Sequence, residues 1–301
     1  TAWYDANFEI VNSGTINFSS SKKSTAIFAE SARAKNDGVI KLGESSTGIY
    51  GIYKDGTDKY APAAVNKLEI ETTANSDISL GKNSTGMYLI NAQKLTNAAG
   101  GKIESATGAT NNVGIYAING KIDVPTTGTT DEINEANTYN GNTANFNILN
   151  MDNKANITLG NGSVGIYTRG KGTAIADRNI VRNDGNITVG DKITVSKTEN
   201  YPAVGIYAEN TQLTQGNAGT ANITVGNKGL AFYGKNSEIT AKGTVNYTNQ
   251  GTLAYLEDSE FTSHYGNLTA HQNTMLFLKN SKAYMDGAGT KIDITVPDKA
   301  A

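Results

Sequence analysis

The chain of 301 residues carries 26 basic and 28 acidic side chains, so its formal net charge is only −2. No basic field is present to attract phosphate backbones, so nucleic-acid binding has no electrostatic support. The absence of cysteine excludes disulfides and thiolate metal sites, and no apolar run reaches the roughly 18 residues that a membrane-spanning helix needs.

The composition favours short strands joined by tight turns over helices. The sequence has 36 asparagines, 33 glycines and only 4 prolines, and hydrophobic residues make up 38% of it. Asparagine and glycine tolerate the left-handed backbone conformations of sharp turns, and both are poor helix formers. We therefore expect an all-β protein.

A motif of small, apolar and aromatic residues, usually Gly-Ile-Tyr, recurs nine times along the chain. Its copies lie at residues 24–31, 46–53, 84–91, 112–119, 163–170, 203–210, 229–236, 252–259 and 274–281. We assign its apolar centres to Ile27, Ile49, Met87, Ile115, Ile166, Ile206, Phe232, Tyr255 and Phe277, which are spaced by 22, 38, 28, 51, 40, 26, 23 and 22 residues. A unit of about 22 residues therefore repeats, and the longer gaps hold insertions.

Two further strands accompany each copy of the motif. A segment of the form x-Ile-x-Leu/Val-Gly precedes it, at residues 15–20, 39–44, 77–82, 156–161, 186–191, 222–227 and 267–272. A less regular strand follows it, at 237–241, 259–263 and 281–285, and residues 7–11 and 290–297 supply additional strands at the two ends. An Asn-x-Gly turn often opens the repeat, as at residues 12–14, 36–38, 183–185 and 249–251.

Three alternating strands and sharp turns in about 22 residues predict a right-handed parallel β-helix (a solenoid) of about nine to ten rungs over residues 1–301. A leucine-rich repeat has a similar length, but its leucine pattern is missing, and a WD40 blade needs about twice the length. Each rung can bury its apolar face only against its neighbours, so the coil is one cooperative unit.

Alternation along each strand assigns side chains to the two faces of the coil wall. The isoleucines at Ile49, Ile115, Ile166 and Ile206 form an interior column. Within one strand, Val164, Ile166 and Thr168 share the inner face, and Gly165 and Tyr167 share the outer one. The drift from Gly-Ile-Tyr toward larger apolar residues near the C-terminus predicts a wider, more aromatic interior there.

A column of tyrosines follows from the same register, formed by Tyr50, Tyr88, Tyr116, Tyr167, Tyr207 and Tyr233. It is either an exposed stripe that serves as a ligand platform or a structural ladder that stacks between rungs or is covered by a loop. We favour the structural ladder.

Three insertions interrupt the repeat, at residues 54–66, 123–145 and 191–202. Insertions in solenoids form surface loops, often on a binding face. Each insertion carries one tyrosine, at Tyr60, Tyr139 and Tyr201, and we expect these as exposed contacts to a partner protein or glycan. The alternative is that the loops are tolerated decoration with incidental tyrosines.

Catalytic and metal-binding patterns are weak in this sequence. His264 and His271 are its only histidines, and neither Cys nor a Glu-x-x-His helix accompanies them. A β-helix hydrolase or lyase needs clustered carboxylates, whereas an Asp-Gly turn explains Asp184 and solvation explains Asp131 and Glu132. We expect no catalytic residue, no metal site and no cofactor.

The combination of N-x-G-x-I-x-L/V-G at 183–190 with the Gly-Ile-Tyr segments at 163–168 and 203–210 resembles the passenger region of autotransporters, specifically the large fusobacterial adhesins. Weaker copies extend the resemblance over almost the whole chain. It implies type V secretion and display on the outer membrane of a Gram-negative bacterium, where such passengers bind host cells or other bacteria. Since neither a signal peptide nor a membrane barrel is visible, we expect a fragment whose barrel lies elsewhere in the full protein.

Three functions follow as hypotheses. The first is an adhesin segment that attaches to a protein or glycan on a host or bacterial surface. The second is a purely structural stalk that displays a distal binding tip, and the third is a β-helix carbohydrate-active enzyme. Long insertions gathered on one side with Tyr60, Tyr139 and Tyr201 exposed would favour direct binding, and bare faces with short insertions would favour the stalk. A cluster of acidic residues on one face would favour the enzyme.

Overall fold

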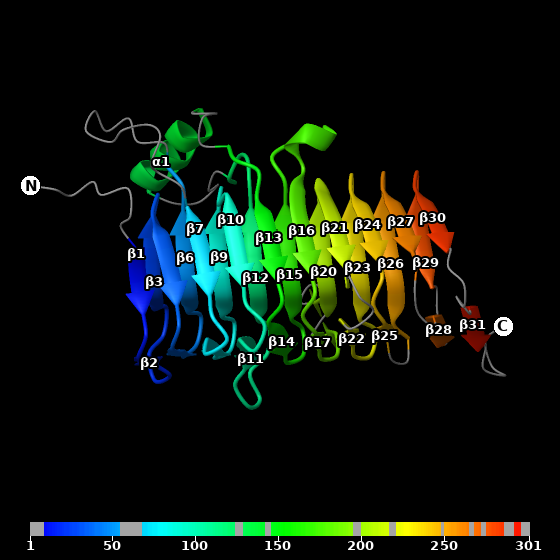
Figure 1. Ribbon diagram of the computed structural model, residues 1–301, viewed down its shortest axis with the longest axis horizontal. Coiled ribbons are helices and arrows are strands. Elements are labelled where there is room, and N and C mark those ends of the chain that lie inside the picture. Colours follow the sequence, from blue (N-terminus) through cyan, green and yellow to red (C-terminus); the bar gives the residue numbers. More distant parts are fainter. Residues whose placement is uncertain are drawn as a thin grey trace, which may run out of the picture.

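Three parallel sheets wind around one interior and form a rod, with the two termini at its opposite ends (Figure 1). The computed structural model describes residues 9–54, 68–123, 129–141, 146–194, 200–216, 221–247, 250–264, 268–271, 275–285 and 292–295. Each rung passes through one strand of sheet A, one of sheet B and one of sheet C, in that order. Strands that are neighbours in a sheet therefore come from successive rungs, and the predicted parallel β-helix of nine to ten rungs is confirmed.

The strands have these bounds. Sheet A contains β1 (Glu9–Asn12), β4 (Arg33–Asn36), β7 (Glu69–Thr72), β10 (Lys94–Asn97), β13 (Asn150–Asn153), β16 (Asn179–Asn183), β21 (Thr211–Gln215), β24 (Glu238–Ala241), β27 (Glu260–Ser263) and β30 (Lys282–Met285). Sheet B contains β2 (Thr15–Phe18), β5 (Val39–Leu42), β8 (Asp77–Leu80), β11 (Lys102–Ser105), β14 (Asn156–Leu159), β17 (Ile187–Val189), β22 (Ile223–Val225) and β25 (Val245–Tyr247). Sheet C contains β3 (Thr25–Glu30), β6 (Thr47–Ile52), β9 (Thr85–Ile90), β12 (Val113–Ile118), β15 (Val164–Arg169), β20 (Val204–Glu209), β23 (Leu230–Lys235), β26 (Thr252–Glu257) and β29 (Leu276–Lys279).

The remaining elements lie outside these sheets. A hairpin is formed by β18 (Ile193–Thr194) and β19 (Asn200–Tyr201), and β28 (Leu268–His271) pairs with β31 (Ile292–Thr295). The helix α1 (Thr130–Gly141) and the short 3-10 helix η2 (Ile175–Asp177) both leave the coil between sheets C and A. The composition had argued against helices, and α1 is a local exception.

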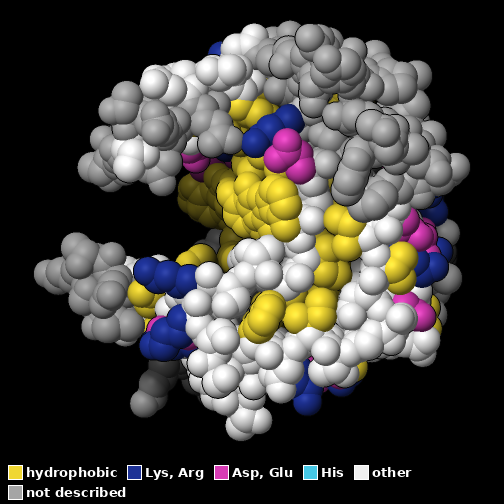
Figure 2. Space-filling view, turned by 90° about the vertical axis from the view of Figure 1, so that its left-hand side faces the viewer, with side chains coloured by type: hydrophobic (Ala, Val, Ile, Leu, Met, Phe, Trp, Pro, Cys, Tyr) yellow, Lys and Arg dark blue, Asp and Glu magenta, His cyan; other side chains and the backbone are white. Residues whose placement is uncertain are grey.

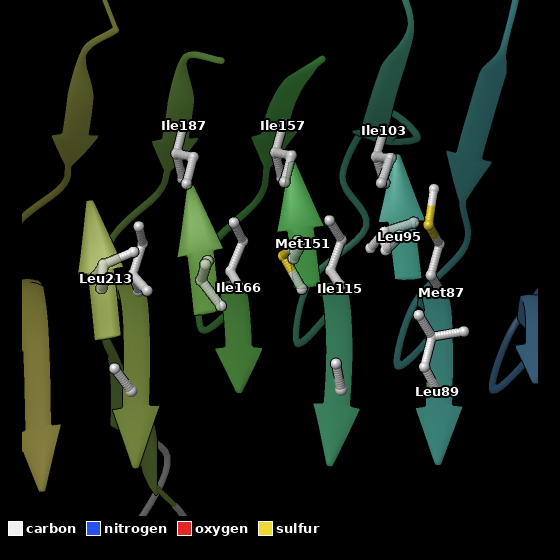
Figure 3. Packing of buried hydrophobic residues seen from close by; sticks show 14 of the residues in the cluster. Met87, Leu89, Leu95, Ile103, Ile115, Met151, Ile157, Ile166, Ile187 and Leu213 are labelled. Carbon is white, nitrogen blue, oxygen red and sulfur yellow. The ribbon is translucent and has the colours of Figure 1, made fainter. Parts of the chain in front are cut away.

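The interior consists of columns of identical or similar apolar residues (Figure 3). Sheet B contributes Ile103, Ile157 and Ile187, which are paired in register from rung to rung. Sheet C contributes Ile115 and Ile166. All five are at most 1% exposed. Since a single rung leaves such side chains uncovered, burial of these columns couples each rung to its neighbours. The predicted interior positions of Ile49 and Ile206 are likewise confirmed.

The predicted outward position of Gly165 is wrong. A Cβ built on Gly165 would come within 2.6 Å of the Cγ2 of Ile187, which lies in the interior. Later rungs place Ala231 and Leu253 at the same register position, and both are fully buried. Residues 165 and 166 thus face inward in succession, and Val164 lies only half-buried outside them. Strict alternation fails at this position of the strand.

The centres assigned to the last two repeats are wrong by one residue. Tyr255 pairs with Tyr233, and Ala254 pairs with Phe232. In the next rung Phe277 continues the tyrosine column, and Leu276 takes the interior position. The predicted aromatic character of the interior near the C-terminus is confirmed, because Phe232 and Phe261 are both fully buried with ring centroids 5.6 Å apart. A greater width of the interior there stays a prediction.

Sharp corners flank many of the strands of sheet C. Residues with positive φ precede these strands, as at Asn83 (57°) and Asn111 (55°), and follow them, as at Asn91 (53°) and Asn210 (48°). Asparagine adopts this left-handed conformation more readily than other residues with a Cβ. The abundance of asparagine in the composition thus has a structural cause.

A second set of asparagines is buried at the corner between sheets A and B. Asn97 donates through its side chain to the Oδ1 of Asn153, at 2.6 Å, and Asn153 in turn donates to Asn183. Asn183 donates to the Oε1 of Gln215 at 2.7 Å. Because each amide has both donors and an acceptor, successive rungs satisfy one another's buried polar groups.

We expect Asn153→Leu to lower the free energy of unfolding by about 2–4 kcal/mol, because the buried amides of Asn97 and Asn183 each lose a partner. Urea titration followed by circular dichroism measures this. The matched control is Asn156→Leu, an exposed asparagine in the next strand, which should change stability by less than about 0.5 kcal/mol. Equal effects of the two substitutions would contradict the role assigned to the buried amides.

Candidate binding groove along the aromatic ladder

Nine aromatic rings stack along the outer face of sheet C, one from each strand. We call this set the aromatic ladder, and it comprises Phe28, Tyr50, Tyr88, Tyr116, Tyr167, Tyr207, Tyr233, Tyr255 and Phe277. Neighbouring ring centroids are 4.3–5.4 Å apart, and neighbouring ring planes differ by 7–15°. The predicted structural stacking of the tyrosines is confirmed.

The stacking decides which part of each ring a ligand could reach. The faces of the inner rings are covered by the rings of the rungs before and after, so the ring edges and phenol oxygens are left to face outward. Only the two end rings, Phe28 and Phe277, are more exposed, at 53% and 45%. The ladder is therefore a row of ring edges and hydroxyls, with one phenol from each of its seven inner rungs.

The residue two positions after each ladder ring also faces outward, and it changes character along the coil. It is charged in the first rung, at Glu30, and apolar in the next three, at Ile52, Ile90 and Ile118. From Arg169 onward it is charged, and Glu209, Lys235, Glu257 and Lys279 alternate in sign in the last four rungs. We call the residues at this position the margin of the ladder. The margin divides the ladder into a first half, up to Tyr167, and a second half, from Tyr207 to Phe277.

Helix α1 covers the first half of the ladder. Its Tyr139 forms a hydrophobic cluster with the three isoleucines of the apolar margin, and Tyr50, Tyr88, Tyr116 and Tyr167 pack against this cluster. Among the described residues, the part of the ladder that packs against the cluster ends at Tyr167. The apolar residues in this margin are therefore explained by the helix that lies over them.

Polar contacts hold α1 and the base of its insertion to the coil. Asn91 donates to the hydroxyl of Tyr139, and the side chain of Asn140 bonds both the N–H and the C=O of Ile122, at 2.8 and 2.9 Å. Tyr139 is only 5% exposed. The prediction of an exposed contact at Tyr139 on a surface loop is therefore wrong, because α1 turns this side chain toward the coil.

The other two predicted contact tyrosines have different outcomes. Tyr201 belongs to β19 and is half-buried, and its Cβ lies 2.8 Å from the position that a Cβ on Gly162 would take. The insertion at 191–202 thus forms a hairpin that packs on the corner before β15. Tyr60 and, apart from Lys54, the insertion at 54–66 lie outside the described residues. Whether Tyr60 or Tyr201 contacts a partner remains a prediction.

The insertions border the ladder on two sides. The segments with α1 and η2 leave from the C-terminal ends of sheet C strands and lie on the same upper side of the coil in Figure 1. The hairpin of β18 and β19 lies at the N-terminal ends of these strands. Figure 2, which looks along the coil from its N-terminal end, shows a hollow with hydrophobic side chains on its floor. We take the outer face of sheet C along the aromatic ladder, between the insertions at the two ends of its strands, as the candidate binding groove.

Several phenols of the ladder have a raised pKa and remain neutral at ordinary pH. Burial raises the pKa of Tyr88 and of Tyr167 to about 12, and in both cases a neighbouring phenol of the ladder adds to the shift. Burial also raises the pKa of Tyr207, Tyr233 and Tyr139. The groove therefore presents uncharged hydroxyls that can both donate and accept hydrogen bonds.

These shifts predict loss of stability in alkali. A phenol ionises at about pH 10 when unfolded, and the folded values of Tyr88 and Tyr167 are about 12. Their contribution to stability is therefore complete below pH ~10 and is lost as the pH rises through the folded values. We expect the melting temperature to fall over this range and to fall less in a Tyr88→Phe/Tyr167→Phe variant. Parallel curves for the two proteins would contradict the assignment.

Replacement of Tyr139 with alanine should detach α1 without unfolding the coil. The substitution removes a buried ring, a change that costs about 3–5 kcal/mol in a core, but here the loss falls on a local element. We expect faster proteolysis within residues 124–145 and a cooperative melt of the remaining coil. Asn137→Ala, on the exposed side of α1, is the control. Loss of cooperative melting in Tyr139→Ala would show that α1 is integral to the coil.

Charged groups elsewhere on the described surface form ion pairs between rungs. A shallow depression on sheet A is lined by Glu9, Arg33, Glu69, Glu71 and Lys94, among others. Glu69 pairs with Arg33, and Glu71 pairs with Lys35, each at 3.2 Å. This is the arrangement of a solvated sheet face, and we base no catalytic function on it.

Within the described residues, no group of three or more His, Cys, Asp and Glu side chains is placed to hold a metal ion. His264 follows β27 and is half-buried. None of the described helices combines the length and hydropathy required to cross a lipid bilayer.

No protein-family model matches the chain, and no curated protein or solved structure matches it either. The fold and the groove therefore provide the basis for a functional proposal, together with the sequence motifs.

The charged margin Glu209–Lys235–Glu257–Lys279 was not singled out in the sequence. Its signal was present, because these residues occupy the same position of successive Gly-Ile-Tyr repeats as Ile52, Ile90 and Ile118. Comparison of that one position across the repeats shows a change from apolar to charged residues.

Proposed function

We propose that the chain is an adhesive segment displayed on a bacterial surface, where it attaches to a host cell or to another bacterium. The observation that carries the proposal is the groove along the aromatic ladder, bordered by insertions at both ends of the sheet C strands. A regular coil fixes the position of every ladder side chain, so a ligand would meet a preorganised surface.

The extended shape of the coil suits display away from a membrane. A stack of rungs lengthens without a second core, which allows a binding surface to be carried on a rod. The resemblance of the Gly-Ile-Tyr repeats to autotransporter passengers supports the same function, and in that case the segment would be joined to an outer-membrane barrel. The ligand would be a surface protein or glycan.

Binding of the labelled full chain to epithelial cells and to other bacteria tests the proposal. We expect saturable binding that is weakened at least tenfold by Thr252→Arg, which places a bulky charge beside the ladder in β26. The matched control is Thr240→Arg on the outer face of sheet A, which should bind as the parent does. Both threonines are half-buried in the parent chain.

A structural stalk is the second candidate, and the burial of Tyr139 favours it, because one predicted contact residue serves the fold instead. A stalk predicts a folded, cooperatively melting chain that binds no cell. Equal loss of binding in Thr252→Arg and Thr240→Arg would also count against adhesion through the groove.

A further inference from the structure

We propose that the second half of the aromatic ladder, from Tyr207 to Phe277, binds an extended, uncharged oligosaccharide that lies along the axis of the coil. The inference rests on the proposed adhesive function and names the class of ligand and the part of the groove that binds it. The inference is drawn from the residues that cover the ladder, from the charges of its margin and from the hydroxyl groups of its tyrosines.

The two halves of the ladder differ in their cover. In the first half, three isoleucines and Tyr139 form a cluster against the rings. In the second half the corresponding margin is charged, and within the described part of the chain that cluster does not reach the rings after Tyr167. A charged margin is suited to contact with water or with a polar ligand, so we assign the ligand to this half.

The charges of this margin cancel. Lys235 pairs with Glu209 at 3.0 Å, and Lys279 pairs with Glu257 at 3.4 Å. Two carboxylates and two ammonium groups give these four residues no net charge. An acidic glycan or another polyanion would gain no attraction there, whereas a neutral chain has no charge to desolvate.

The floor presents hydrogen-bonding groups at a regular interval. The hydroxyls of Tyr207 and Tyr233 bond to each other, and that of Tyr233 lies 3.5 Å from the Oε1 of Glu257. The ring of Tyr233 lies 4.3 Å from that of Tyr207 and 5.4 Å from that of Tyr255, so three phenols follow one another along the axis. Ring edges carry partial positive charge and favour oxygen-rich groups. A polymer with hydroxyls on every unit matches such a row.

A peptide fits the same surface less well. An extended peptide binds best at a sheet edge, where free backbone N–H and C=O groups continue the ladder of hydrogen bonds. The groove lies on the face of sheet C, and the backbone groups of β20, β23 and β26 already bond to their neighbours in the sheet. The hydroxyl-rich ligand is therefore the one that the side chains of this face can satisfy.

Arrays of linear oligosaccharides of equal length test the proposal, with neutral hexose oligomers beside carboxylated and sulfated ones. The full chain is expected to bind neutral oligomers. Tyr207→Phe/Tyr233→Phe keeps the stack but removes two hydroxyls, and it should weaken binding about tenfold. Tyr284→Phe, at an exposed tyrosine of sheet A, is the control and should change nothing. An unchanged affinity in the double variant would overturn the proposal.

A charge variant tests the selectivity independently. Glu209→Lys/Glu257→Lys makes the margin uniformly basic, and it should shift binding from neutral to acidic oligosaccharides. Parallel assays on cells separate this inference from the proposed function. Cell binding without oligosaccharide binding, or cell binding abolished by a competing peptide, would overturn the ligand class and leave adhesion standing. Absence of cell binding as well would overturn both.

Discussion

Replacement of Gly165 with valine is expected to lower the free energy of unfolding by about 3 kcal/mol or more. A Cβ on Gly165 would lie 2.5 Å from the carbonyl oxygen of Gly205 and 2.6 Å from the Cγ2 of Ile187. The oxygen is part of the backbone of sheet C, so it can give way only if β15 and β20 move apart. Because burial of the interior couples neighbouring rungs, we expect the damage to spread beyond one strand.

Urea unfolding followed by far-ultraviolet circular dichroism measures this loss, with Gly14→Val as the matched control. A Cβ on Gly14 would meet nothing within 4 Å, so its stability should change by less than about 0.5 kcal/mol. If Gly165→Val proved as stable as the parent, Gly165 would have to face outward, as strict alternation along the strand predicts.

Truncation of Phe232 to alanine should cost about 3–5 kcal/mol, since a large buried ring leaves a cavity that a closely packed coil fills only in part. Phe232 is fully buried, and its ring centroid lies 5.6 Å from that of Phe261 in β27 of sheet A. Ala231 and Leu253, which take the register position of Gly205 in these rungs, are fully buried as well. We expect the rungs after β23 to lose protection from amide hydrogen exchange first.

Phe277→Ala provides the comparison, because this ring is 45% exposed and, among the residues that the structure describes, stacks on Tyr255 alone. A loss of about 0.5–1.5 kcal/mol is expected there. A second comparison, Phe232→Leu, keeps most of the apolar volume and should recover a large part of the stability. Equal losses in Phe232→Ala and Phe277→Ala would mean that the interior of the last rungs is loosely packed.

Several features of the coil could be predicted from the position of each residue in the repeat. The alternation in each strand placed Ile115, Ile166 and Ile206 inside, and the recurrence of tyrosine after them produced the stacking of the ladder. Asparagine at the corners followed from its tolerance of positive φ. Each of these properties depends on a few neighbouring residues and is then repeated rung by rung, so a local pattern is sufficient to determine it.

The register between strands near the C-terminus was harder to predict from the sequence, because the Gly-Ile-Tyr motif changes there. Leu-Ala-Phe-Tyr and Thr-Leu-Ala-Tyr-Leu align equally well in two ways when only residue types are compared. The structure pairs Tyr255 with Tyr233 because this keeps the rings stacked and puts Ala254 and Leu253 inside. The register is determined by which side chains fit into the closed interior, and the sequence of a single strand does not contain that information.

By itself, the sequence determined a parallel β-helix of about 22 residues per rung and the columns of isoleucine and tyrosine, since these rest on local periodicity. Tertiary structure alone decided the inward position of Gly165, which depends on the distance to Ile187 across the coil. It also decided that residues 130–141 form a helix and that Tyr139 is buried. That helix is short and rich in asparagine, so its stability comes from packing over Ile52, Ile90 and Ile118, which are far away in the chain.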